Sequence, residues 1–171
     1  MVKGKNMNIK RVAKHMVTSD IALRSKFSSS VMKSIENSIA ESEKLHCGEI
    51  RFAVENALDF FPVLKNISAR ERAVQVFSDL RIWDTEQNNG VLMYLLFADH
   101  DIEIIADRGI DQKVHVDEWE RICKNMESYF KKGLFEQGVI KGISEITVHL
   151  VNHFPLTGND RDELPNRPVV L

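Results

Sequence analysis

Residues 81–110 read RIWDTEQNNGVLMYLLFADHDIEIIADRGI and place a polar run directly before the most hydrophobic part of the chain. Residues 91–98 are continuously apolar, which is typical of a central β-strand that is covered on both faces. Residues 99–101 are short enough for a hairpin turn, and residues 102–106 then return as the next strand. The stretch therefore predicts a β-hairpin at the centre of the fold.

Apolar residues at helical spacing predict about four helices around this hairpin. Serines at residues 28–30 offer an N-cap to one helix, and the run Ser68-Ala69-Arg70-Glu71 is a capping box that opens another. One more strand is indicated at residues 48–55, where apolar and charged residues alternate. The predicted helices cover approximately residues 28–45, 68–80, 119–132 and 135–150.

The order of these elements predicts an α/β fold, a three-layer α/β/α sandwich with a small mixed sheet. A helical crossover joins the strand at 48–55 to the strand at 91–98, so these two strands should be parallel, whereas the hairpin makes the third antiparallel. A chain of 171 residues suits one domain, which we assign to residues 27–154. A basic arm, residues 1–26, precedes it, and a proline-containing tail, residues 155–171, follows it.

Charge is unevenly distributed along the chain. Residues 1–26 carry seven Lys and Arg residues against one Asp, although the whole chain has a formal charge of −2. The remainder is therefore acidic, which argues against binding of nucleic acid by the folded part. The arm could contact an anionic membrane surface or an unidentified protein partner, or form a solvated, partly ordered tail. The sequence shows no secretory signal, membrane span or disulfide framework, so a cytoplasmic location is expected.

Oxygen-bearing side chains concentrate in the loops that should meet at one end of the predicted sheet. The start of the first predicted strand places His46, Cys47 and Glu49 at this same end of the sheet. Calcium and magnesium take oxygen ligands from carboxylates, amides and backbone carbonyls, so this end is the candidate site for Ca²⁺ or Mg²⁺. The candidate ligands are Asp84, Glu86, Asn88, Asn89, Asp107 and Asp111.

Simpler interpretations compete with this metal site. The polar run does not match an EF-hand loop, because Gly90 stands one residue late and Leu95 occupies the place of the final Glu. It could serve only as a turn, with Asn89-Gly90 supplying the geometry. Asp99-His100-Asp101 imitates the paired aspartates of haloacid-dehalogenase-like phosphatases, although a hairpin turn is favoured. Cys47, beside a histidine, is either an activated thiol or, more commonly, a packed side chain.

Three segments resemble the TPM domain family. They are CGEIRFAVE at residues 47–55, ERAVQVFSDLRIWDTEQNNGVLMYLLFADHDIEIIADRGI at 71–110 and FKKGLFEQGVIKGI at 130–143. The family includes a thylakoid-lumen phosphatase-like protein, a photosystem II repair factor and a receptor-accessory domain, and the chain is similar to a soluble bacterial-type member. The resemblance implies a compact α/β/α sandwich, divalent-cation binding and, as claimed for some plant members, weak acid phosphatase activity. Asn88 stands where the family has the Asp of Asp-Asn-Gly-Val-Leu, which lowers the charge of the implied site.

Two functions are consistent with these observations, and whether the protein is an enzyme stays open. The first is a non-catalytic interaction module that binds a divalent cation and a protein or membrane partner. The second is a metal-assisted acid phosphatase that uses the same acidic loops, with Arg108 on the phosphate. In that case the ion would be surrounded by Asp84, Glu86, Asp107 and Asp111.

Overall fold

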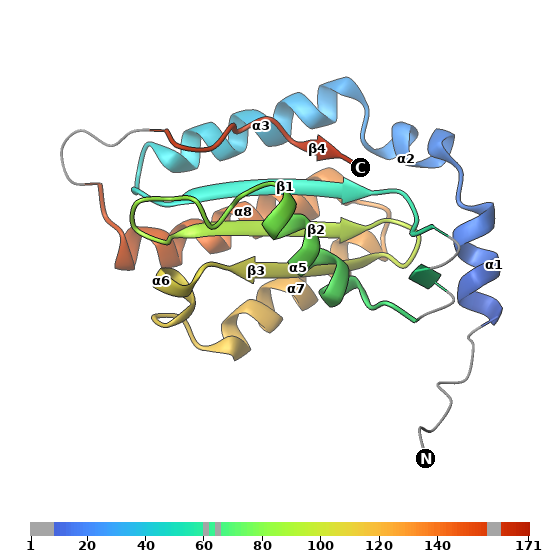
Figure 1. Cartoon of the computed structure of the whole chain (residues 1–171). Coiled ribbons are helices and arrows are strands. Elements are labelled where there is room, and N and C mark those ends of the chain that lie inside the picture. The colour runs from blue at the N-terminus through green and yellow to red at the C-terminus, as the bar shows by residue number, and fades with distance from the viewer. Residues whose placement is uncertain (1–8, 60–61, 64–65, 157–161) are drawn as a thin grey trace, which may run out of the picture.

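A mixed sheet of four strands, in the order β3-β2-β1-β4, forms the centre of the molecule (Figure 1). The computed structural model describes residues 9–59, 62–63, 66–156 and 162–171. The strands are β1 (Glu49–Glu55), β2 (Gly90–Leu96), β3 (Asp101–Ala106) and β4 (Val169–Val170). Strand β1 runs parallel to β2 and to β4, and β2 pairs antiparallel with β3. The predicted parallel pair and the predicted hairpin are therefore both confirmed.

Helices cover both faces of this sheet, which confirms the three-layer α/β/α sandwich (Figure 1). Helices α3 (Ser29–Glu43), α7 (Val116–Phe130) and α8 (Phe135–His153) pack on one face, and α5 (Ala69–Asp79) packs on the other. The predicted capping box is present, because the Ser68 and Glu71 side chains each accept a backbone N–H at the start of α5.

The helix count was too low in the sequence prediction. The described residues contain seven helices instead of about four, because α1 (Ile9–Val17), α2 (Asp20–Lys26) and α6 (Arg108–Asp111) are added. Helices α1 and α2 lie in the segment that was assigned to the basic arm. Helix α6 has only four residues, which is too short to produce a periodic apolar pattern.

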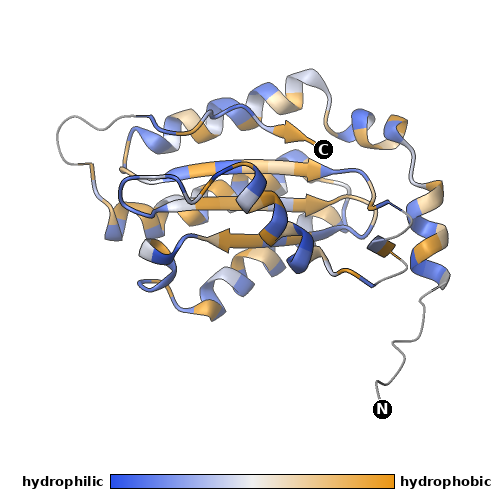
Figure 2. Ribbon diagram, viewed as in Figure 1, coloured by the Kyte–Doolittle hydropathy of each residue, from blue (hydrophilic) through white to orange (hydrophobic). Residues whose placement is uncertain are grey.

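Strand β2 is the most hydrophobic segment of the chain and lies inside the sheet, between β3 and β1. Every residue of β2 is buried, because β2 has a strand on each side and a helical layer on each face. Val91, Met93 and Leu95 face α3, α7 and α8. Leu92 and Tyr94 face α5. Figure 2 shows β2 and β3 mostly in hydrophobic colours, whereas hydrophobic and hydrophilic residues are mixed along the helices.

The described part of the predicted arm packs against the domain. Ser19 caps α2 by accepting the N–H of Ala22, and α2 buries Leu23 in the main core. In α1, Arg11 and His15 reach Asp99 in the β2–β3 turn, at 2.9 and 3.1 Å. Residues 1–8 lie outside the described residues, so contact between residues 1–26 and an anionic membrane stays a prediction. No helix in the described ranges is both long and apolar enough to cross a bilayer.

The segment assigned to the C-terminal tail contributes to the fold where it is described. Strand β4 pairs with β1, and the N–H of Leu171 donates to the carbonyl of Val54. Leu164 is buried in the core on the α5 face. Residues 162–171 therefore run along the edge of the sheet that β1 would otherwise expose.

Candidate functional site

Three chain segments meet at one end of the sheet, where β1 and β2 begin. Because these strands are parallel, Glu49 lies opposite Gly90 at their starts. Strand β3 runs the other way and ends beside them, and the N–H of Asp107 donates to the carbonyl of Gly90. The polar run before β2, the turn before β1 and the start of α6 are therefore neighbours.

Asn88 joins the polar run to α6. Its backbone is left-handed, with φ of 53°, so Asn88 is the residue that makes the turn expected at Asn89-Gly90. The N–H of Gly109 donates to the Asn88 carbonyl, and Nε of Arg108 donates to Oδ1 of Asn88, each at 2.9 Å. An amide oxygen that was predicted to bind metal is thus bonded to the guanidinium that was predicted to bind phosphate.

Asn89 and Asp107 each bury an acceptor oxygen that has no hydrogen-bond partner among the described residues. Nδ2 of Asn89 donates to the Cys47 carbonyl at 2.6 Å, which leaves its Oδ1 as the unpartnered atom. Asp107 is the N-cap of α6 and accepts the N–H of Arg108 through Oδ1, so its unpartnered atom is Oδ2. Both residues therefore retain an oxygen that is free to accept a ligand bond, and their role in metal binding stays a prediction.

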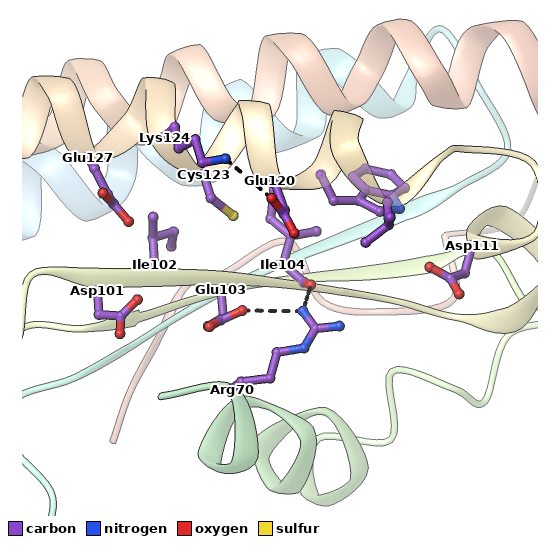
Figure 3. A pocket seen from close by; sticks show the side chains of 12 residues that line it. Arg70, Asp101, Ile102, Glu103, Ile104, Asp111, Glu120, Cys123, Lys124 and Glu127 are labelled. Atoms are coloured by element: carbon purple, nitrogen blue, oxygen red, sulfur yellow. Dashed lines mark hydrogen bonds and ion pairs between the residues drawn. The ribbon is translucent and has the colours of Figure 1, made fainter. Parts of the chain in front are cut away.

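Of the other predicted ligands, Asn88 is partly buried, whereas Asp84, Glu86 and Asp111 are exposed. Asp84 and Glu86 are exposed on the polar run, and the N–H of Glu86 donates to the Glu163 carboxylate at 3.0 Å. Asp111 is exposed on α6 and lines a groove beside β3 (Figure 3). Within the described residues, the predicted carboxylates do not form a close group of three. The predicted ligand set stays a prediction.

A different group of three carboxylates does converge at this end of the sheet. One oxygen each from Glu43, Glu49 and Asp162 lie within 4.8 Å of one another. Glu43 ends α3, Glu49 begins β1, and Asp162 precedes the C-terminal segment that covers the edge of the sheet. Glu49 was expected at this end, but Glu43 and Asp162 were not. Glu43 could have been noticed in the sequence, because it is an acid in the last turn of a helix, where the helix dipole disfavours it.

Hydrogen bonds from the backbone hold two of these carboxylates in place. Oε1 of Glu43 accepts the N–H of Ile50 at 3.1 Å. The two oxygens of Glu49 accept the N–H groups of Glu163 and Leu164 at 2.9 and 3.2 Å. The acidic group is therefore fixed to the first residues of β1 and to the C-terminal segment.

Burial makes ionisation of Glu43 and Glu49 unfavourable. The pKa of Glu43 is raised to about 8, chiefly by burial; the hydrogen bond from Ile50 opposes this rise, and the nearby charges of Glu49 and Asp162 add to it. Burial likewise raises the pKa of Glu49 to about 7. Arg51 is close enough for these acids to favour its charged form, although burial lowers its pKa. Its guanidinium donates to the Arg167 carbonyl, and the charges of Glu43, Glu49 and Asp162 all act on it.

Residues 24–149 match the family model of the TPM domain. The chain belongs to the TPM family. The domain is also similar to the BA42 protein of the psychrophilic bacterium Bizionia argentinensis, whose structure was determined by NMR. The two share 33% sequence identity with a TM-score of 0.74, over 84% of this chain and 94% of BA42. No curated protein matches the chain. The TPM match includes Glu43 and Glu49 but ends before Asp162.

Proposed function

We propose that this TPM-domain protein is a non-catalytic interaction module that binds one divalent cation, Ca²⁺ or Mg²⁺, through Glu43, Glu49 and Asp162. The convergence of three carboxylate oxygens within 4.8 Å of one another carries this proposal. Calcium binds oxygens at roughly 2.4 Å, so two of its ligands can be at most about 4.8 Å apart. The spacing of the three oxygens thus suits a single shared ion.

Beside the three acids, we infer Asn166 as a further ligand. The Asn166 side chain hydrogen-bonds to Glu43, and Oδ1 of Asn166 is buried with no hydrogen-bond partner in the described ranges. An amide oxygen beside carboxylates is a ligand that hard cations accept. This unpartnered oxygen supports a cation at the acidic group, because a bound ion would satisfy it.

The raised pKa values fit a site that exchanges protons for a cation. Glu49 is buried, Glu43 is partly buried and Asp162 is exposed, and their charges repel one another. Protonation of Glu43 and Glu49 relieves this repulsion when no ion is bound. A divalent cation would replace those protons, so affinity should increase as the pH rises through the pKa values of the two groups.

Binding is better supported than catalysis. Arg108, which the phosphatase interpretation assigns to the phosphate, is bonded to Asn88. The Cys47 thiol is buried and donates to the Pro155 carbonyl. Burial raises the pKa of the Cys123 thiol to about 12, so this thiol is protonated at neutral pH. The acid phosphatase interpretation stays a prediction and is tested together with cation binding.

Thermal unfolding at pH 8, with CaCl₂ or MgCl₂ added, tests the proposal. At ten times the dissociation constant, the cation should raise the melting temperature by about 3–5 °C, because it binds only the folded state. Glu49→Gln should abolish this shift. Glu41→Gln is the matched control, since Glu41 is an exposed acid on the same helix as Glu43, with a side chain that is 71% exposed.

The variant Asp107→Asn tests whether the cation is bound by the loop residues predicted from the sequence instead of by Glu43, Glu49 and Asp162. This variant should show the same cation-dependent rise in melting temperature as the wild type. In a separate assay, the wild type should not hydrolyse a generic phosphate ester, with or without the cation. No shift in the wild type at several millimolar of either cation would refute cation binding. A shift that is lost in Asp107→Asn but kept in Glu49→Gln would move the site to the loops before β2 and after β3.

A further inference from the structure

Strand β3 forms one edge of the sheet, and a groove of about 450 Å³ runs beside it (Figure 3). Residues of β3 form its floor, α7 forms one wall, and Arg70 at the start of α5 forms part of the other. Figure 3 shows Glu120, Cys123 and Glu127 extending from α7 toward β3, with Arg70 approaching from the opposite side. The groove therefore lies where a fifth strand would continue the sheet.

The outer backbone groups of β3 are directed into this groove. In an antiparallel pair, the residues of each strand alternate between those bonded to the neighbour and those whose N–H and C=O point away. Asp107 bonds to Gly90, so the outward residues of β3 are Ile102, Ile104 and Ala106. Arg70 confirms this direction, because its guanidinium donates to the Ile104 carbonyl at 2.7 Å.

The groove has an excess of negative charge. Its lining contains five carboxylates and two basic side chains. Both bases are already paired, Arg70 with Glu103 and Lys124 with Glu120, each at 3.2 Å. The carboxylates are Asp101, Glu103, Asp111, Glu120 and Glu127.

Repulsion between the acidic side chains of the groove affects the pKa of Asp101. Burial, followed by the charges of Glu103 and Glu127, raises the pKa of Asp101 to about 6. A basic ligand would relieve this repulsion, and Arg70 shows how a guanidinium is accepted, since it contacts both a carboxylate and an edge carbonyl of β3. The Arg70 side chain is 56% exposed, so it can move aside for a ligand.

We propose that the groove beside β3 binds an extended peptide rich in Lys or Arg, which adds to β3 as a fifth strand. The backbone of Ile104 is already bonded to Arg70 and to the Cys123 thiol. Backbone hydrogen bonds to Ile102 and Ala106 would therefore provide affinity, and the acidic walls would select basic side chains. In a strand, alternate side chains point to opposite faces, so basic residues at every second position all reach the same wall, either that of Glu120 and Glu127 or that of Glu103. This proposal does not depend on the cation site.

An NMR titration of the ¹⁵N-labelled protein with the capped peptide acetyl-Lys-Val-Lys-Val-Lys-Val-amide tests this proposal. Saturable shifts should centre on the amides of residues 101–106 and on α7. A peptide with Glu in place of Lys should not bind. A peptide N-methylated at alternate amides should not bind either, because it retains the charge but cannot complete the strand.

Two double variants distinguish the effect of the groove's carboxylates on peptide affinity from the effect of the protein's overall charge. Glu120→Gln/Glu127→Gln should weaken binding about tenfold, the size expected for two charge contacts at a partly exposed site. Glu41→Gln/Glu118→Gln removes the same charge outside the groove lining and should change affinity less than about twofold. Absence of binding at millimolar peptide, or equal binding of the N-methylated peptide, would overturn the proposal. Concentration-dependent dimerisation with the same shifts would do so as well, since a second copy would then be the occupant.

Discussion

The carboxylate of Glu49 accepts the backbone N–H of Glu163 at 2.9 Å and joins the first residue of β1 to the C-terminal segment. The same carboxylate accepts the N–H of Leu164. These bonds bring Asp162 next to Glu43, which ends the helix before β1. The acidic group is thus assembled from two parts of the chain that are distant in sequence.

Raising the pH should destabilise the cation-free protein through this group. The pKa of Glu43 is about 8 in the folded state, against an ordinary value of 4.5. Between these values the folded state holds a proton that the unfolded chain has released, so the free energy of unfolding falls as pH rises. Urea unfolding in EDTA should show a contribution on the order of 2 kcal/mol between pH 6 and pH 8.5.

Glu43→Gln isolates this contribution from those of other titrating groups. The variant should lose stability less steeply than the wild type over the same pH range, because the amide does not ionise. Glu41→Gln should keep the wild-type slope, since Glu41 is exposed. Parallel curves for Glu43→Gln and the wild type would show that Glu43 does not bind the extra proton.

Gly109 holds the polar run against α6 and should not tolerate a side chain. A Cβ at this position would lie 2.5 Å from the Gln87 carbonyl oxygen and 2.6 Å from that of Asn88, and both are backbone atoms. Gly109→Ala should therefore reduce the free energy of unfolding by about 1–3 kcal/mol. It should also speed amide hydrogen exchange in residues 85–89. An unchanged urea midpoint and exchange pattern would show that the two loops adjust freely.

Asp99 should hold helix α1 on the domain. Its carboxylate accepts Nε of Arg11 and Nε2 of His15, whose Nδ1 accepts the Leu58 N–H. Burial opposes ionisation of Asp99, but these two hydrogen bonds prevail and lower its pKa. The stabilisation is thus present above the ordinary pKa of Asp and is lost as pH falls through the lowered one.

Asp99→Asn should cost about 1–2 kcal/mol, because it leaves Arg11 and His15 with a neutral partner. Hydrogen exchange should accelerate in residues 9–17, while β1 and β2 keep their protection. Asp117→Asn is a suitable control, since the Asp117 side chain is 78% exposed. If exchange in α1 is the same in all three proteins, other contacts fix this helix.

Local patterns in the sequence were sufficient to predict the centre of the fold. The apolar run of β2, the short turn after it and the capping box before α5 are all encoded within a few residues. Helices α1 and α2 were missed because their basic composition resembles that of a tail. Their position depends on contacts such as that between Arg11 and Asp99, which are 88 residues apart.

The candidate site was only partly predictable for the same reason. The sequence pattern placed Glu49 at the correct end of the sheet, because the start of a strand can be read locally. Asp162 reaches this end only because the C-terminal segment returns along β1, held by the bond between Glu49 and Glu163, which are 114 residues apart. No local pattern around residue 162 indicates that return.

Isothermal titration calorimetry of the metal-free protein with CaCl₂ and MgCl₂ at pH 7, in buffers of different ionisation enthalpy, tests the cation site most directly. It measures both binding and the number of protons released. Because the pKa values of Glu43 and Glu49 are about 8 and 7, binding of one cation at pH 7 should release between one and two protons. Glu49→Gln should abolish binding, and Glu41→Gln should not. Absence of binding heat with both cations, or binding without proton release, would contradict a cation held by Glu43, Glu49 and Asp162.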